Sequence, residues 1–175
     1  MRACSIAAAI ALMAACSPGG GDTPTSTSSP RTSSSASSST TVTADEATVL
    51  SGYRSFWDAY LAAANPMDPQ NPVLAQHATG KQLETIQRAF LARRAGGEVI
   101  RGTLDLAPRV VSVVGDKAGV RDCYLDNTGV YDAATGARKD TASGVRHLVT
   151  VSMQLDAGEW KVSDLKKEGD GCATA

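Results

Sequence analysis

The segment that most constrains this chain is a serine- and threonine-rich run over residues 17–43. Of these 27 residues, 17 are Ser or Thr, and Pro18, Pro24 and Pro30 are spaced among them. Such a segment has almost no apolar surface to bury, so it cannot offset the entropy lost on ordering. We therefore expect residues 16–43 to form a disordered tether, which leaves residues 44–175 as a single folding domain.

An apolar stretch precedes the tether. Residues 5–15 follow one basic residue, Arg2, and are almost entirely apolar. The stretch has the length of the apolar region of a signal peptide, and it is too short to span a bilayer core of roughly 30 Å. We expect residues 1–15 to be a signal peptide that is removed on export.

The residues before Cys16 resemble the lipobox of bacterial lipoproteins. Ala14 and Ala15 match the small residues that precede the lipidated cysteine, whereas Met13 stands where that family most often has Leu, Val or Ile. The resemblance implies that Cys16 carries the lipid and holds the protein on the outer face of the bacterial cell membrane. The alternative is an ordinary secretory signal, in which Cys16 is incidental and the protein is secreted.

The remaining cysteines suit an exported domain. Cys123 and Cys172 form an even pair in an oxidising compartment, which predicts a disulfide. Two thiols and two scattered histidines are poor material for a metal site, and the spacing of the thiols does not suit a redox pair. We therefore expect neither a metal nor a cofactor.

Charge and motifs exclude several classes of function. The formal net charge of −1 argues against nucleic-acid binding, because neutralising phosphates requires a basic surface. The sequence contains no glycine-rich phosphate loop, no G-x-S-x-G and no H-E-x-x-H motif. Nucleic-acid binding, nucleotide-dependent chemistry and metal-dependent hydrolysis therefore lose support.

Helical periodicity fills the first part of the domain. Thr43 and Glu46 form a predicted capping box, after which apolar residues recur at helical spacing until the Asn65-Pro66 stop. A short helix is predicted from Asn71, as N-cap, to residue 76. A second capping box, beginning at Thr79, predicts a third helix that ends at the glycine pair 96–97.

After residue 97 the periodicity changes from 3.6 to 2. The predicted strands are 98–106, 109–114, 118–125, 145–155 and 160–165, with a long polar connection over residues 126–144. Short connections make neighbouring strands antiparallel. Helices followed by strands indicate an α+β fold, with a curved antiparallel sheet and the N-terminal helices packed on its concave face.

This order of elements resembles the cystatin-like or nuclear transport factor 2-like cone fold, and in particular the small actinobacterial lipoproteins that carry it. The matching features are FWDAY at residues 56–60, the glycine pair 96–97 and GEWKVSDL at residues 158–165. The resemblance implies a conical pocket between the helices and the sheet, in a family that includes isomerases, dehydratases and ligand carriers. The candidate ligand contacts are aromatic: Trp57, Tyr60, Phe90 and Tyr124. A regular aromatic stripe is also the usual pattern of a core-facing helix.

Strand alternation selects two candidate catalytic residues. His147 is the only titratable residue in the alternating row from 145 to 155, and Asp122 shares a row with Val120 and Tyr124. If both rows face inward, Asp122 and His147 could meet, and an imidazole held by a carboxylate suits proton abstraction or water activation. The alternative is a partly buried histidine satisfied by a Tyr, an Asp or a backbone carbonyl.

Together these features favour a membrane-anchored, extracytoplasmic binding or accessory module without catalysis, with a pocket for a small apolar ligand. Two alternatives stay open. One is a cofactor-independent isomerase or dehydratase that uses His147 and Asp122. The other is a protein-binding subunit of an envelope complex.

Overall fold

The computed structural model describes residues 44–141 and 144–173. The predicted signal peptide, Cys16, the tether and the capping residue Thr43 lie outside these residues. Three helices come first, namely α1 (Ala44–Ala63), α2 (Pro72–His77) and α3 (Gly80–Ala95). The strands that follow are β1 (Glu98–Arg101), β2 (Leu104–Asp105), β3 (Arg109–Val114), β4 (Lys117–Asp126), β5 (Gly129–Asp132), β6 (Val145–Asp156) and β7 (Glu159–Asp170).

The two predicted caps that the structure describes have different outcomes. The Asn71 side chain accepts a hydrogen bond from the Val73 amide at 3.1 Å, which confirms it as the N-cap of α2. The capping box at Thr79 is wrong, because Thr79 makes no side-chain cap hydrogen bond. Its backbone is extended, and its amide donates instead to the Val162 carbonyl of β7 at 2.9 Å. The start of α3 is therefore fixed by its link to the sheet.

The strands form antiparallel sheets, as predicted. In the larger sheet the order is β2-β4-β6-β7, and β3 also pairs with β4; β1 and β5 form a separate two-stranded sheet. The predicted strand over 98–106 is broken at Gly102, which has a φ of +129° and approaches Asn127 so closely that a Cβ would lie 2.4 Å from its carbonyl oxygen. The predicted polar connection contains β5, which pairs with β1.

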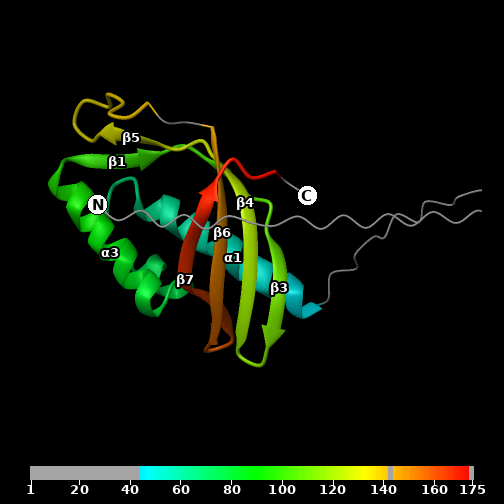
Figure 1. Cartoon of the computed structure of the whole chain (residues 1–175). Coiled ribbons are helices and arrows are strands. Elements are labelled where there is room, and N and C mark those ends of the chain that lie inside the picture. Colours follow the sequence, from blue (N-terminus) through cyan, green and yellow to red (C-terminus); the bar gives the residue numbers. More distant parts are fainter. Residues whose placement is uncertain (1–43, 142–143, 174–175) are drawn as a thin grey trace, which may run out of the picture. The chain divides into compact units, whose positions relative to one another are not determined.

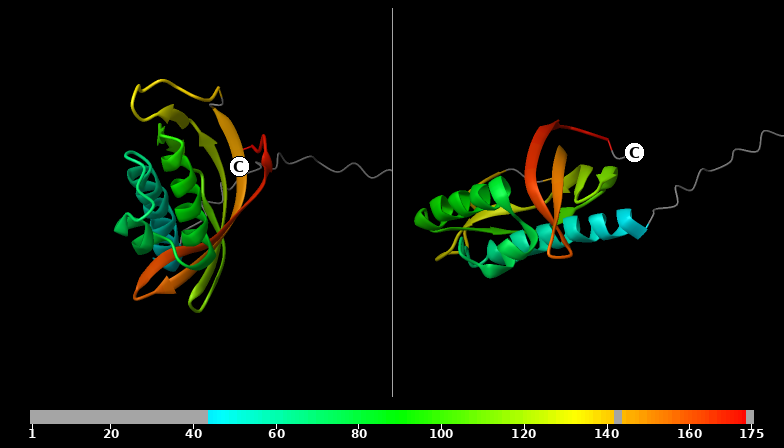
Figure 2. Two further views of the ribbon diagram at one scale, coloured as in Figure 1. Left: turned by 90° about the vertical axis from the view of Figure 1, so that its left-hand side faces the viewer. Right: turned by 90° about the horizontal axis from the view of Figure 1, so that it is seen from below.

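The helices pack on one side of the larger sheet. Both α1 and α3 contact β7, and α1 also contacts β3. Figure 1 shows α1 passing behind β4 and β6, and Figure 2 shows the β6–β7 hairpin bending toward the helices. The arrangement is an α+β fold with an open, curved antiparallel sheet, whose helix-facing side holds the core.

The core is aliphatic and aromatic. Its most deeply buried members come from all three helices and the inner face of the sheet: Val49, Tyr53, Phe56, Leu74, Phe90, Val120, Val149, Val151, Met153 and Val162. Gly52 lets α1 approach the sheet closely, because a Cβ at this position would lie 2.5 Å from the Trp160 carbonyl oxygen. The two rows that alternation assigned to the inner face are confirmed over most of their length. Leu155, beside the β6–β7 turn, is the exception and is 37% exposed.

The disulfide between Cys123 and Cys172 is confirmed, with the two Cα atoms 6.0 Å apart. It joins β4 to the chain just after β7. None of the helices within the described ranges is both long and apolar enough to cross a membrane.

Candidate functional site

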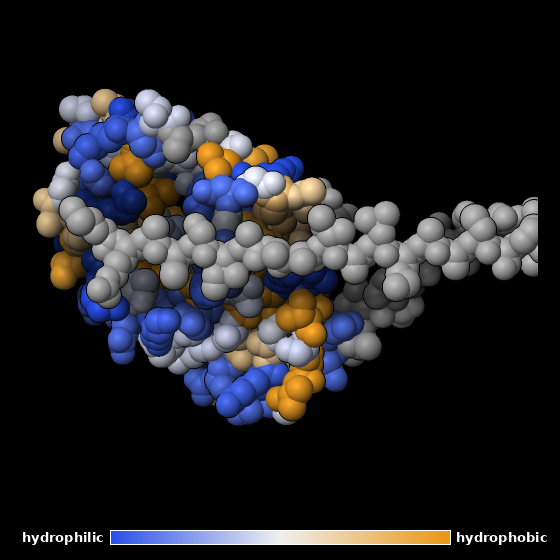
Figure 3. Space-filling view, in the orientation of Figure 1, coloured by the Kyte–Doolittle hydropathy of each residue, from blue (hydrophilic) through white to orange (hydrophobic). Residues whose placement is uncertain are grey.

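A cavity of about 240 Å³ opens at the end of the domain where β1 and β5 lie. Figure 3 shows the hollow, with hydrophobic and hydrophilic residues on its wall. Residues from the helices, both sheets and the segment after β5 meet there, although they are far apart in the sequence. The lining residues are Tyr60, Arg93, Ile100, Asp126, Thr128, Val130, Asp140, Val145 and His147.

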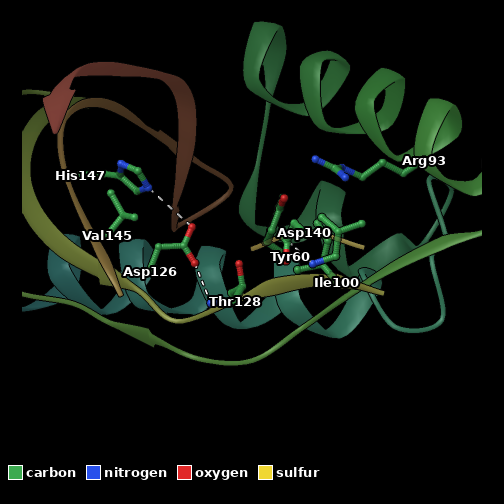
Figure 4. Close-up of a pocket in the computed structure, with 9 residues that line it drawn as sticks. Tyr60, Arg93, Ile100, Asp126, Thr128, Asp140, Val145 and His147 are labelled. Atoms are coloured by element: carbon green, nitrogen blue, oxygen red, sulfur yellow. Dashed lines mark hydrogen bonds and ion pairs between the residues drawn. The ribbon is translucent and has the colours of Figure 1, made fainter. Parts of the chain in front are cut away.

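His147 lies in this cavity with a carboxylate near each ring nitrogen. Its Nδ1 hydrogen-bonds to Asp170, and its Nε2 lies 3.8 Å from Asp126 Oδ2. Asp126 also accepts a hydrogen bond from the Thr128 amide at 2.8 Å, so its carboxylate is held in place (Figure 4). The pKa of Asp170 is lowered, first by the hydrogen bond from Lys167 and then by that with His147. Both carboxylates therefore orient the imidazole, and Asp126 shares the cavity wall with it.

The hydroxyl group of Tyr60 belongs to the same cavity but comes from α1. Burial raises the pKa of Tyr60, an effect that Arg93 opposes and Asp126 reinforces. The phenol therefore stays protonated near neutral pH and can donate a hydrogen bond. Among the residues that the structure describes, the hydroxyl has no hydrogen-bond partner. It is therefore a polar group of the wall that a ligand could engage.

A second cavity, of about 250 Å³, adjoins the first, because Tyr60, Asp126 and Thr128 line both. Its wall is mainly apolar and aromatic and includes Phe56, Trp57, Ile86, Leu104, Tyr124 and Leu165. The two cavities together give a small site with a charged and hydroxylated end and an aromatic end. Each volume alone lies just below the usual range of ligand pockets, which begins at about 300 Å³.

Three of the four aromatic residues predicted as ligand contacts lie on these walls. Trp57 and Tyr124 line the second cavity with ring centroids 5.2 Å apart, and Tyr60 lines both cavities. Phe90 is fully buried and lines neither cavity. Its ring packs against Tyr60 with a centroid distance of 5.0 Å. It therefore supports the wall from behind.

The structure does not pair Asp122 with His147, although both lie on the inner face. Asp122 is 1% exposed; one carboxylate oxygen accepts from the Tyr53 hydroxyl and the other from the Ala107 amide, each at 2.9 Å. In the register of β4 and β6, Asp122 lies opposite Val149, two residues beyond His147. Burial, the largest influence, raises the pKa of Asp122. Asp122 is thus a buried structural carboxyl, and its position near His147 is taken by Asp126.

Sequence reasoning missed Asp126, Asp170 and Arg93 as members of this region. Asp126 could have been found, because it continues the alternating row of Asp122 and Tyr124 by one step. Asp170 could not, because the predicted last strand ended five residues before it. Arg93 gave no signal of a site, because basic residues are common at the negative end of a helix such as α3. Within residues 44–141 and 144–173, no group of three or more His, Cys, Asp and Glu could hold a metal ion.

Comparison with known proteins informs the fold alone. No protein-family model matches the sequence, and no match is found among curated proteins. Among solved structures, the fold is similar to that of the intermembrane-space region of the chloroplast protein ARC6, with a TM-score of 0.54 and 16% sequence identity. The alignment covers 70% of this chain and 95% of the ARC6 chain. At this identity the likeness concerns the arrangement of helices and strands.

Proposed function

We propose that this protein is a lipid-anchored, extracytoplasmic binding protein whose domain is a nuclear transport factor 2-like cone. The helices and the curved antiparallel sheet support the cone, and the lipobox-like sequence before Cys16 supports the anchor. The ligand is a small molecule with a flat apolar body and a hydrogen-bonding head. It is held between α1, α3 and the sheet.

The observation that carries this proposal is the pair of adjoining cavities. The aromatic end supplies Trp57 and Tyr124, which suit an apolar ring or chain. The polar end supplies the free hydroxyl of Tyr60 and the carboxylate of Asp126 beside His147. A hydroxyl or amine on the ligand could donate to Asp126 while it accepts from Tyr60. A purely apolar ligand would leave these groups unsatisfied, which is costly in a partly buried site.

Native mass spectrometry tests the binding role. We expect the full chain, purified from its own host, to carry a small molecule that Tyr60→Phe weakens by about tenfold, since a buried hydrogen bond is lost. The matched control is Tyr131→Phe, because Tyr131 lines neither cavity and its ring lies near the guanidinium groups of Arg101 and Arg138. A chain that always emerges without ligand, or equal effects of the two substitutions, would contradict the proposal.

The anchor has a separate test. Cys16→Ser removes the thiol that lipidation requires, whereas the domain beyond the tether should fold unchanged. Since each buried methylene contributes about 0.8 kcal/mol, several acyl chains hold a protein on a membrane essentially permanently. We expect the wild-type chain to partition into detergent and to incorporate a palmitate analogue, and the Cys16→Ser chain to do neither. If both chains partition alike, the protein is not anchored through Cys16.

A second candidate is a cofactor-independent enzyme of the isomerase or dehydratase kind. The observation in its favour is that Asp126 and His147, held by Thr128 and Asp170, share one cavity wall. In that role the His147 imidazole would transfer the proton, and Asp126 would orient the imidazole. Host small-molecule extracts should then change in composition on incubation with wild type but not with His147→Gln. A ligand that is bound and recovered unchanged would favour the binding protein.

A further inference from the structure

A row of three basic residues and one threonine crosses the outer face of the sheet, on the side away from the helices. Arg109 of β3 lies directly opposite Arg121 of β4, which lies opposite Thr150 of β6, which in turn lies opposite Lys166 of β7. All four side chains are exposed. Figure 1 looks onto this face, because α1 passes behind the strands. The row is separate from the pocket beneath the helices.

Within residues 44–141 and 144–173, the two arginines have no counter-charge. Neither Arg109 nor Arg121 makes an ion pair or hydrogen bond to any residue in the part of the chain that the structure describes. Lys166, by contrast, lies 3.3 Å from Glu168. Like charges at directly opposite positions of an antiparallel pair repel and destabilise the sheet. An anion placed between the two guanidinium groups would remove this repulsion.

The same two arginines line a hollow of about 240 Å³. Its floor includes Leu148 and the disulfide between Cys123 and Cys172, which fixes the chain end after β7 against β4. Asp122 also borders this hollow but does not neutralise the arginines. The residue is 1% exposed, and its carboxylate accepts from the Tyr53 hydroxyl and the Ala107 amide. The hollow is therefore bordered by two cations that have no partner among the described residues, and its base is cross-linked by the disulfide.

We propose that this hollow binds a phosphate group between Arg109 and Arg121. Each guanidinium presents a planar fork of donors that matches two oxygens of one phosphate, and two such forks suit a doubly charged group. The Thr150 hydroxyl and the Lys166 ammonium group extend the row by one donor each. The phosphate belongs either to a lipid headgroup or to a free phosphorylated small molecule. The site does not depend on the ligand pocket, and it does not require the lipid anchor.

The test uses the full chain with Cys16→Ser, so that no acyl chain contributes. Arginine side-chain NMR signals are followed during titration with inorganic phosphate, and with NaCl at matched ionic strength. We expect saturable shifts of Arg109 and Arg121 with phosphate alone. Arg109→Gln with Arg121→Gln should weaken binding by about tenfold or more, as expected when charged hydrogen bonds are lost. The matched control, Arg88→Gln with Arg94→Gln on α3, removes the same charge and should bind as before.

Vesicle flotation separates the two sources of phosphate. If the Cys16→Ser chain floats with phosphatidylglycerol vesicles but not with phosphatidylcholine, and the Arg109/Arg121 variant does not, the group is a lipid headgroup. Saturable phosphate binding without flotation assigns the site to a free small molecule. Shifts that NaCl reproduces, shifts that do not saturate, or equal affinity of the two double variants would overturn the proposal. Flotation without saturable phosphate binding would also overturn it.

Discussion

Asp122 and His147 lie on the same face of the same sheet, yet their surroundings differ. Asp122 is 1% exposed and satisfied by Tyr53 and Ala107, so it forms part of the sealed core. His147 lines an open cavity and is held by Asp126 and Asp170. The register places the partner of Asp122 only two residues beyond His147 on β6.

The difference lies in what covers each position. Asp122 lies beneath α1, which provides the Tyr53 hydroxyl as its partner. His147 lies near the end of the sheet, where Asp170 from the end of β7 and Asp126 from the end of β4 supply its partners. The sealed region is therefore held mainly by packing, and the pocket end mainly by polar and covalent links. A titratable residue on an inner face can serve a site only where the helix layer leaves it open.

Among our predictions about the two regions, removal of the disulfide should have the largest effect. Cys123→Ser with Cys172→Ser opens a link between residues separated by 49 positions. Chain-entropy reasoning gives a loss of up to about 4 kcal/mol in the free energy of unfolding. Because the link ties the end of β7 to β4, hydrogen exchange should accelerate first around His147 and Asp170.

Chemical denaturation and hydrogen exchange measure the two parts of this prediction. In the double variant, the amides of the inner-face residues Val149 and Val151 should stay as well protected from hydrogen exchange, relative to the rest of the sheet, as in wild type. Core packing holds these residues. Uniform acceleration over the whole sheet would show that the pocket end and the sealed region are not held separately.

The next test removes each of the two compared residues in turn. Asp122→Ala leaves the Tyr53 hydroxyl and the Ala107 amide without their buried acceptor, so we expect a loss of about 3 kcal/mol. His147→Ala should cost less than about 1 kcal/mol, because Asp170 is exposed and the ring is partly solvated. Urea unfolding curves measure both. The loss of stability for Asp122→Asn, which keeps one acceptor, should lie between the losses for the two alanine variants. A greater loss for His147→Ala than for Asp122→Ala would contradict our assignment of Asp122 to the core and His147 to the cavity.

The smallest predicted effect is a difference in the sign of pH dependence. Burial raises the folded-state pKa of Asp122, so its contribution to stability falls as pH rises from the ordinary carboxyl range to the raised value. The pKa of Asp170 is lowered, so its contribution is present above the ordinary carboxyl range and is lost as pH falls through the folded value.

Denaturant midpoints between about pH 3 and pH 7 test these signs. Relative to wild type, Asp122→Asn should gain stability as pH rises, and Asp170→Asn should lose it. If the two differences run in the same direction, either the burial of Asp122 or the pairing of Asp170 is misassigned.

Much of the fold follows from local patterns in the sequence. Helical spacing predicts α1 and α3, Asn71 predicts the start of α2, and alternation predicts the inner rows of β4 and β6. The missed features depend on distant partners. The short strand β5 is defined by pairing with β1, and the Thr79 amide is engaged by Val162, far along the chain. A local pattern carries no information about such contacts.

The site, too, could be predicted only in part, because some of its contacts join residues that are distant in the sequence. Periodicity identified Trp57, Tyr60 and Tyr124, because helix and strand faces follow from spacing. It could not choose between Asp122 and Asp126 as the partner of His147, because both lie on one face. That choice depends on tertiary packing, which brings the Tyr53 hydroxyl against Asp122 and leaves Asp126 on the cavity wall.

A crystal structure of the full chain purified from its own host would test most directly whether the two cavities bind a ligand. We expect electron density for a small molecule that spans the two cavities, with a polar group at Tyr60 and Asp126 and an apolar part beside Trp57. Cavities that hold only ordered water would contradict the proposal that this end of the domain is a ligand site.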